Sequence, residues 1–153
     1  MSEEIARAIS AELVRLYLEA LQRQDVEALG ALVTDDFYLE VPFDAAGTNQ
    51  PGNALSWTGR DDYLTNYCAI FPHIAVHRIN DIVIRPTADP AIVYAEAMGD
   101  MTLSDGWPYK NLYVFRFTLR GDKICQLKEF CNPVTAAIAF GHPLPITGRV
   151  HDR

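Results

Sequence analysis

The spacing of hydrophobic residues predicts that helices come first along the chain. Apolar residues recur every three or four positions at the N-terminus, as on one face of a long helix. This face consists of Ile5, Ile9, Leu13, Leu16, Tyr17, Ala20 and Leu21. Asp25 is placed to cap a shorter second helix. The inward-facing residues of that helix are Ala28, Leu29, Leu32 and Val33.

The middle of the chain predicts one strand, one long loop and one more helix. The segment DDFYLEVPF has β character, and we expect its strand to end near Pro42. Residues 44–58 are rich in Gly, Ala, Asn and Pro, and a loop of this length is more often a functional flap than a simple connector. A third helix begins near GRDDYL and must stop by Pro72. Its residues at helical spacing are Tyr63, Leu64, Tyr67 and Phe71.

The second half of the chain has the pattern of strands separated by turn signals. The four predicted strands cover roughly 74–85, 91–103, 109–120 and 123–131, and form a meander of antiparallel neighbours. Alternation is clearest in the third, where one face carries Tyr109, Asn111, Tyr113, Phe115, Phe117 and Leu119. Asn132 and Pro133 then start a short helix that stops at Gly141.

This order of elements predicts an α+β fold in which the early helices cover one face of a strongly curved antiparallel sheet. Such a cone commonly keeps a pocket open at one end. At 153 residues and 49% hydrophobic content, the chain suits a single domain, 1–153, with one core.

Charge and composition narrow the classes of partner. The net charge is −7 without any run of Lys or Arg, so we expect no nucleic-acid partner. No apolar stretch approaches the roughly 20 residues of a membrane span, and MSEEIARAIS does not resemble a signal peptide, so we expect a cytoplasmic protein without a membrane partner. Cys68, Cys125 and Cys131 form no disulfide framework. No phosphate, dinucleotide or zinc motif is recognisable, so we expect no metal and no cofactor.

Glu129 is the first candidate for chemistry because it lies between Leu127 and Cys131 in an apolar stretch. A buried carboxyl has a raised pKa, which suits general acid/base catalysis. The alternative is a surface glutamate paired with Lys128 or Arg116. Strand parity leaves this open, since a Gly121–Asp122 hairpin puts Ile124 and Glu129 on opposite faces unless a bulge intervenes.

Polar groups on aromatic faces are the next candidates. Asn111 and Tyr113 suit a flat, carbonyl-bearing ligand, and Tyr17 and Tyr67 could aim hydroxyls into the same cavity, although tyrosines at such positions also serve as packing residues. We expect His73 and His77 to be rim or surface residues rather than metal ligands. The other predicted ligand-binding residues are Tyr63, Phe43, Trp57, Phe71, Phe115 and Leu127.

The order and spacing of three segments resemble the nuclear transport factor 2-like superfamily, in its SnoaL-like and ketosteroid isomerase-like branch. These segments are 16–43, 57–72 (WTGRDDYLTNYCAIFP) and 111–133 (NLYVFRFTLRGDKICQLKEFCNP). The resemblance implies a cone-shaped domain with an apolar pocket, usually dimeric, that works as an enzyme or as a binding shell.

Residue by residue, the resemblance to the steroid isomerases is incomplete. Tyr17 matches their oxyanion-hole tyrosine, and Tyr67 matches the tyrosine that supports it. Their proton-shuttling aspartate is replaced by Val41, and Tyr113 stands where their second, protonated aspartate would be. The resemblance therefore argues against the steroid-isomerase mechanism at that position.

A more specific resemblance is to the phenazine-biosynthesis A/B proteins, which share FP at 71–72, DP at 89–90 and EF-x-N at 129–132. It implies that Glu129 is an acid/base residue inside the pocket. The histidine and serine of that pocket fall near Tyr63 and Tyr67, so the same substrate is not implied.

Two functions stay open at this point. The first is a cofactor-free isomerase, cyclase or dehydratase, in which Glu129 moves a proton and Tyr17, Tyr67, Tyr113 or Asn111 stabilises an oxyanion. Its substrate would be a small apolar or aromatic carbonyl compound. The second is a non-catalytic module that binds a small molecule or a partner, because fold does not dictate activity. In either case we expect a homodimer.

Overall fold

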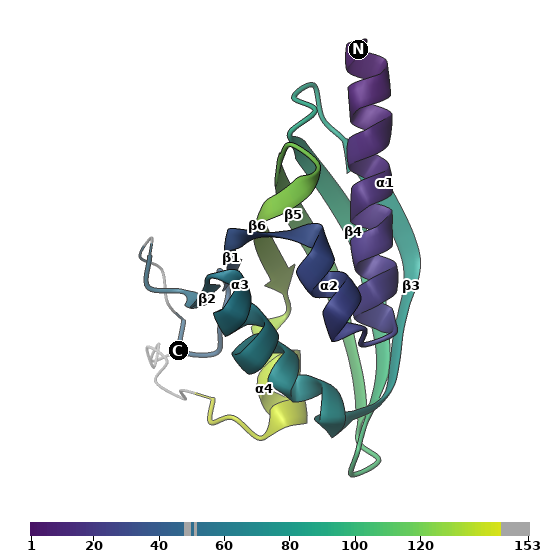
Figure 1. Cartoon of the computed structure of the whole chain (residues 1–153). Helices are drawn as coiled ribbons and strands as arrows, with labels where there is room; N and C mark the ends of the chain where they lie inside the picture. The colour runs from purple at the N-terminus through teal and green to yellow at the C-terminus, as the bar shows by residue number, and fades with distance from the viewer. Residues whose placement is uncertain (48–49, 51, 145–153) are drawn as a thin grey trace, which may run out of the picture.

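A computed structural model describes residues 1–47, 50 and 52–144 (Figure 1). Helices cover one face of a six-stranded sheet, as the sequence predicts for an α+β fold. The helical elements are α1 (Glu3–Gln22), α2 (Val26–Leu32), α3 (Arg60–Asp62), the π-helical turn η1 (Tyr63–Tyr67), the 3-10 turn η2 (Cys68–His73) and α4 (Pro133–Phe140). The strands are β1 (Val33–Val41), β2 (Leu55–Thr58), β3 (Ile74–Pro86), β4 (Ile92–Leu103), β5 (Pro108–Arg120) and β6 (Lys123–Cys131).

The strand order of the sheet is β2-β1-β6-β5-β4-β3. The antiparallel meander β3-β4-β5-β6 is confirmed. Two features correct the sequence prediction. β1 pairs with β6 in parallel, so the sheet is not purely antiparallel. The end of the expected flap is the strand β2, which pairs with β1 from Tyr38 opposite Thr58 to Val41 opposite Leu55.

A bulge in β6 resolves the parity of the last strand. Thr118 pairs with Gln126, whereas the adjacent Leu119 pairs with Ile124, so Cys125 is an extra residue on β6. The extra residue lets Ile124 and Leu127 both reach the core, where each is fully buried. It also brings Glu129, two residues after Leu127, to the same concave face.

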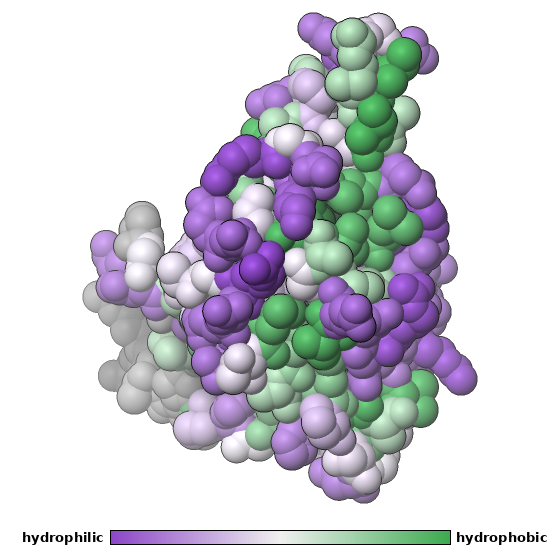
Figure 2. All heavy atoms as spheres, viewed as in Figure 1, coloured by the Kyte–Doolittle hydropathy of each residue, from purple (hydrophilic) through white to green (hydrophobic). Residues whose placement is uncertain are grey.

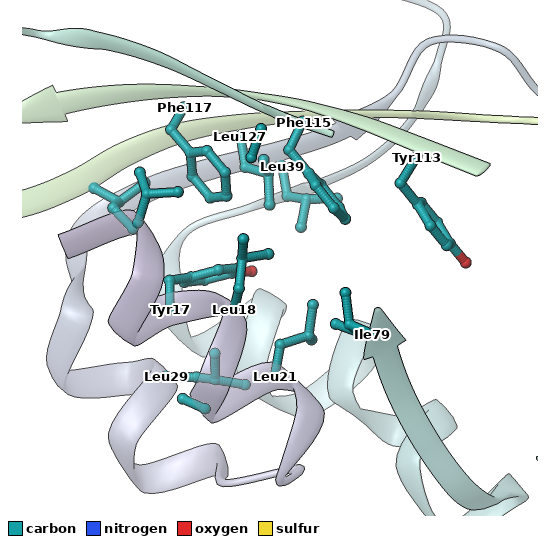
Figure 3. Close-up of a cluster of buried hydrophobic side chains, with 14 of the residues drawn as sticks. Tyr17, Leu18, Leu21, Leu29, Leu39, Ile79, Tyr113, Phe115, Phe117 and Leu127 are labelled. Atoms are coloured by element: carbon teal, nitrogen blue, oxygen red, sulfur yellow. The ribbon is translucent and has the colours of Figure 1, made fainter. Parts of the chain in front are cut away.

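The core lies between α1 and the concave face of the sheet (Figure 3). The alternation predicted for β5 is confirmed, because its residues from Tyr109 to Leu119 are buried at every second position. Tyr17 of α1 packs its ring edge-on against Phe117, with 5.4 Å between the ring centroids. Large buried side chains such as these contribute roughly 1.5–3 kcal/mol each to folding.

The N-terminal half of α1 differs from the prediction. Ile5 and Ile9 are 53% and 52% exposed, and Figure 2 shows hydrophobic atoms where this end of the helix projects beyond the sheet. Here the inward group is Ser10, whose hydroxyl donates 2.6 Å to the carbonyl of Pro90. This half of α1 contacts the β3–β4 turn through polar groups, so the hydrophobic pattern predicted the wrong inward face for it.

The cap signals of α2 and α4 are confirmed, but the expected stop of the third helix by Pro72 is wrong, because η2 runs through Pro72 to His73. Asp25 accepts a hydrogen bond from the Ala28 amide, and Asn132 accepts from the amides of Val134 and Thr135. Gly141 ends α4 in the left-handed conformation, at φ 68°. None of the helices in the described ranges combines the length and apolar character that crossing a membrane requires.

Candidate active site

A cavity of about 930 Å³ lies at the end of the sheet, between η1, η2 and α4. In Figure 1 this is the lower end of the sheet, where the α3 segment and α4 are drawn. Most of its wall is apolar, including Val41, Leu55, Trp57, Ile70, Ala136 and Phe140. The polar residues on the wall include Glu129, Tyr67, Tyr109 and His73. This composition suits an apolar ligand that is oriented by a few polar contacts.

Glu129 lies on the wall with one hydrogen-bond partner among the described residues. The hydroxyl of Tyr67 donates 2.9 Å to Oε2 of the carboxyl. Burial raises the pKa of Glu129 to about 7, and the Tyr67 hydrogen bond opposes part of that rise. The side chain keeps partial exposure because it faces the cavity.

Within the described part of the chain, no lysine or arginine is paired with this carboxyl. Among the described wall residues there is no lysine or arginine. Lys128 lies on the other face of β6, where its Nζ is 3.1 Å from Oε1 of Glu40. The ion pairs of the described residues join Glu129 to neither Lys128 nor Arg116, so the alternative of a surface glutamate paired with one of them does not describe this structure.

Aromatic rings hold Tyr67 in place. Trp57 packs edge-on against Tyr67 at 5.1 Å, and Tyr63 stacks on Tyr67 at 5.2 Å, between ring centroids. Behind them, the hydroxyls of Tyr63 and Tyr17 are 2.7 Å apart and hydrogen-bonded. Tyr17 is thus one layer behind the wall, and burial raises its pKa above the ordinary range.

A second polar cluster lies on β5. Tyr109 receives a 3.0 Å hydrogen bond from the hydroxyl of Tyr113 and another of 3.0 Å from Nδ2 of Asn111. The amide of Asn111 is itself tied to Asn132, at the start of α4. Gly99 on β4 makes room for the cluster, because a Cβ there would lie 2.8 Å from Cε2 of Tyr113. The cluster is therefore closely packed against the sheet.

Four of the predicted site residues line the cavity, namely Glu129, Tyr67, Phe43 and Trp57. The other predicted site residues are not among the described residues of the cavity wall. They are Tyr17, Tyr113, Asn111, Tyr63, Phe71, Phe115 and Leu127. Phe115 and Leu127 belong to the core, and Tyr113 lies at its edge with its hydroxyl directed away from Phe115 (Figure 3).

Sequence reasoning missed several wall residues. Tyr109 is the most informative, since the alternation of β5 already placed it on the concave face. Phe140, whose ring packs edge-on against Tyr109 at 5.0 Å, shows that α4 closes this side of the cavity. The cap signal at Asn132 marked where α4 starts, but no signal in the sequence showed where that helix packs.

The histidines and cysteines that the structure describes form no recognisable metal centre. His73 lies at the cavity and His77 does not, and burial lowers the pKa of His77 to about 4. Within the described ranges, no group of three or more His, Cys, Asp or Glu side chains is arranged to hold a metal ion. Cys131 borders the cavity beside Glu129, and burial raises the pKa of its thiol to about 12.

A curved sheet with helices on one face defines a protein of the NTF2-like, ketosteroid isomerase-like fold class. Residues 14–127 match the SnoaL-like domain, and the chain therefore belongs to the SnoaL-like family. The resemblance seen in the sequence is thereby confirmed. No curated protein sequence matches the chain significantly.

Three solved structures share the fold at low sequence identity. A "putative isomerase" from Bacillus subtilis has TM-score 0.72 and 20% identity, over 94% of this chain and 99% of that one. A phenazine biosynthesis-related protein from Pseudomonas aeruginosa has TM-score 0.73 and 20% identity, over 100% and 93%. A "putative polyketide cyclase" from Xanthomonas campestris has TM-score 0.70 and 18% identity, over 88% and 98%.

Proposed function

We propose that the protein is a cofactor-independent acid/base enzyme of the isomerase, cyclase or lyase type, in which Glu129 moves a proton on a small apolar or aromatic carbonyl compound. The observation that carries the proposal is the position of Glu129, a carboxyl on the wall of an apolar cavity with no lysine or arginine among the described wall residues. Burial there raises the pKa of Glu129 to about 7. A base is most effective when its pKa lies near the working pH.

The proposed reaction begins when the Glu129 carboxylate takes a proton from a carbon next to the carbonyl. The electron pair of the broken C–H bond moves into the carbonyl and gives an enolate. Protonated Glu129 can then return the proton to another carbon, or the enolate carbon can attack a second carbonyl, whose oxygen then takes the proton from Glu129. Within the described chain, Tyr67 binds Oε2 and no group donates to Oε1, so Oε1 is free to meet the substrate.

The wall supports an uncharged, flat substrate. Trp57 and Tyr67 present aromatic surfaces beside the carboxyl, and their rings are fixed by the edge-on contact between them. The names of two fold neighbours, a "putative polyketide cyclase" and a phenazine biosynthesis-related protein, are consistent with ring-containing substrates.

A non-catalytic ligand-binding module is the alternative, and one observation favours it. Val41 lies on the cavity wall, at the position where the resemblance to steroid isomerases would call for their aspartate base. If Glu129 does not exchange protons with a ligand, the cavity binds the ligand without catalysing a reaction.

The test is exchange of α-hydrogens for deuterium, because it needs no knowledge of the product. Bicyclic ketones such as 1-tetralone and 2-tetralone are incubated with the protein in D₂O, and deuterium uptake is followed by NMR. A positioned base contributes about 10²- to 10⁴-fold, so Glu129→Gln should lose at least about 100-fold of the catalysed rate. Glu96→Gln, an exposed carboxyl on β4, is the matched control and should keep the full rate. Equal rates in Glu129→Gln and wild type would rule out the proposed role.

We also propose that the chain forms a homodimer through the outer face of the sheet. Leu112, 66% exposed, pairs across the strands with Met98, and Val114 and Tyr94 are exposed on the same face. An apolar patch of this kind commonly marks an interface.

A further inference from the structure

The hydrogen bonds around Tyr109 fix where its own proton can point. Asn111 Oδ1 accepts from the backbone amide of Asn132 at 3.0 Å, and a backbone amide can only donate. The orientation of the Asn111 side chain is thereby set, and its Nδ2 is the group that donates to the hydroxyl of Tyr109. A second donor, the hydroxyl of Tyr113, is bonded to the same oxygen.

A phenolic hydroxyl has one hydrogen to donate and two lone pairs to accept with. Asn111 and Tyr113 occupy both lone pairs of Tyr109, so its hydrogen is the remaining hydrogen-bonding group. Within the described residues, the Tyr109 hydroxyl makes hydrogen bonds only as an acceptor and donates none. Tyr109 lies on the cavity wall, so an acceptor on a bound ligand is in a position to take the bond.

We propose that Tyr109 is the hydrogen-bond donor that binds the carbonyl oxygen of the ligand, with Asn111 and Tyr113 as positioning residues behind it. The same bond would stabilise the enolate oxygen that forms when Glu129 takes a proton. This catalytic role of Tyr109 rests on the proposed function. Tyr17 is not needed for this role, because its hydroxyl is already bonded to Tyr63.

The surroundings make Tyr109 a strong donor that stays protonated. Two hydrogen bonds onto its oxygen polarise the O–H bond, and bonds in a chain strengthen one another. Burial raises the pKa of Tyr109 to about 12, and the charges of Cys131 and Glu129 add to that rise. The donors Tyr113 and Asn111 oppose it without cancelling it. Near neutral pH the group therefore offers a hydrogen rather than a negative charge.

The test compares two ligands of nearly equal shape, 9-fluorenone and fluorene, which differ by a carbonyl oxygen. One neutral hydrogen bond is worth about 5- to 10-fold in affinity. Wild type should bind fluorenone more tightly than fluorene, and Tyr109→Phe should lose about 5- to 10-fold for fluorenone alone. The infrared C=O stretch of bound fluorenone should lie at lower frequency in wild type than in Tyr109→Phe. Tyr94→Phe, on the outer face of the sheet, is the matched control and should change neither quantity.

Tyr113→Phe separates positioning from contact. It leaves the hydrogen of Tyr109 in place but removes one donor to its oxygen. We therefore expect the C=O stretch of bound fluorenone to lie between the lower frequency of wild type and the higher frequency of Tyr109→Phe. The assignment is overturned if wild type shows no preference for fluorenone, binds neither compound, or shows the same preference and stretch as Tyr109→Phe. Glu129→Gln should keep the carbonyl preference while it loses deuterium exchange. Failure of the proton-transfer role and failure of the donor role are therefore seen in different variants.

Discussion

Replacing Glu129 by glutamine should change how the stability of the protein depends on pH. Burial favours the neutral carboxyl, so the folded chain keeps this proton at pH values where the unfolded chain has lost it. Wild type should therefore lose stability as the pH rises from the ordinary pKa of the group, 4.5, to its folded value of about 7. Glutamine does not titrate, and its amide oxygen can still accept from Tyr67.

The magnitude follows from the size of the pKa change. A rise from 4.5 to about 7 corresponds to about 3 kcal/mol between the two ionisation states. The two proteins should be nearly equally stable at pH 4. At pH 8 the Glu129→Gln variant should be more stable than wild type by up to about 3 kcal/mol, because its neutral amide avoids the cost of a buried charge.

The assay is urea unfolding of both proteins at half-unit steps from pH 4 to pH 8.5, at one protein concentration. Groups other than Glu129 titrate in both proteins, so their contributions cancel when the unfolding free energies are subtracted. Glu96→Gln should give a nearly flat difference, because the carboxyl it removes is exposed. If the difference in unfolding free energy is also independent of pH for Glu129→Gln, then burial does not raise the pKa of Glu129, and the catalytic argument built on that pKa fails.

Three further predictions concern the supports of the site and the outer face. Tyr67→Phe removes the hydrogen bond that lowers the pKa of Glu129, so an NMR titration of this carboxyl should give a higher pKa than in wild type; an unchanged or lower value would contradict the assigned bond. Gly99→Ala puts a Cβ 2.8 Å from the ring of Tyr113 and should cost about 1–3 kcal/mol of unfolding free energy, measured by urea unfolding, and weaken fluorenone binding. Leu112→Glu should convert the proposed dimer to a monomer, as measured by analytical ultracentrifugation, while circular dichroism shows that the fold is kept. A wild-type protein that is already monomeric would refute the proposed interface.

The parts of the fold that the sequence predicted are those set by local periodicity and caps. The alternation along β5 decides its buried face by itself, and Asn132 and Gly141 mark both ends of α4. The segment Leu55–Thr58 escaped detection because four residues carry little pattern, and it becomes a strand only through pairing with β1. The parallel pairing of β1 with β6 joins residues about ninety positions apart, for which a single sequence holds no local signal.

The site was predicted less well because periodicity gives the face of a residue but not its depth. Tyr17 and Tyr67 both lie on inward faces of helices, yet only Tyr67 reaches the cavity. Tyr113 and Tyr109 share one face of β5, and α4 packs at the end that carries Tyr109. The placement of α4 therefore decided which tyrosine lines the cavity, and that packing is a tertiary effect.

The bulge at Cys125 links the stability of the core to the position of the candidate base. A strand in regular register would place Ile124 and Glu129 on opposite faces, so burying one would expose the other. The extra residue places Ile124 and Glu129 on the same face, because Ile124 and Leu127 are fully buried on the concave face that Glu129 also occupies. Burial of these two aliphatic side chains contributes roughly 3–6 kcal/mol, which is comparable to the cost of holding an uncompensated carboxyl in the cavity. The apolar core thus stabilises the register that keeps Glu129 away from the cations that would lower its pKa.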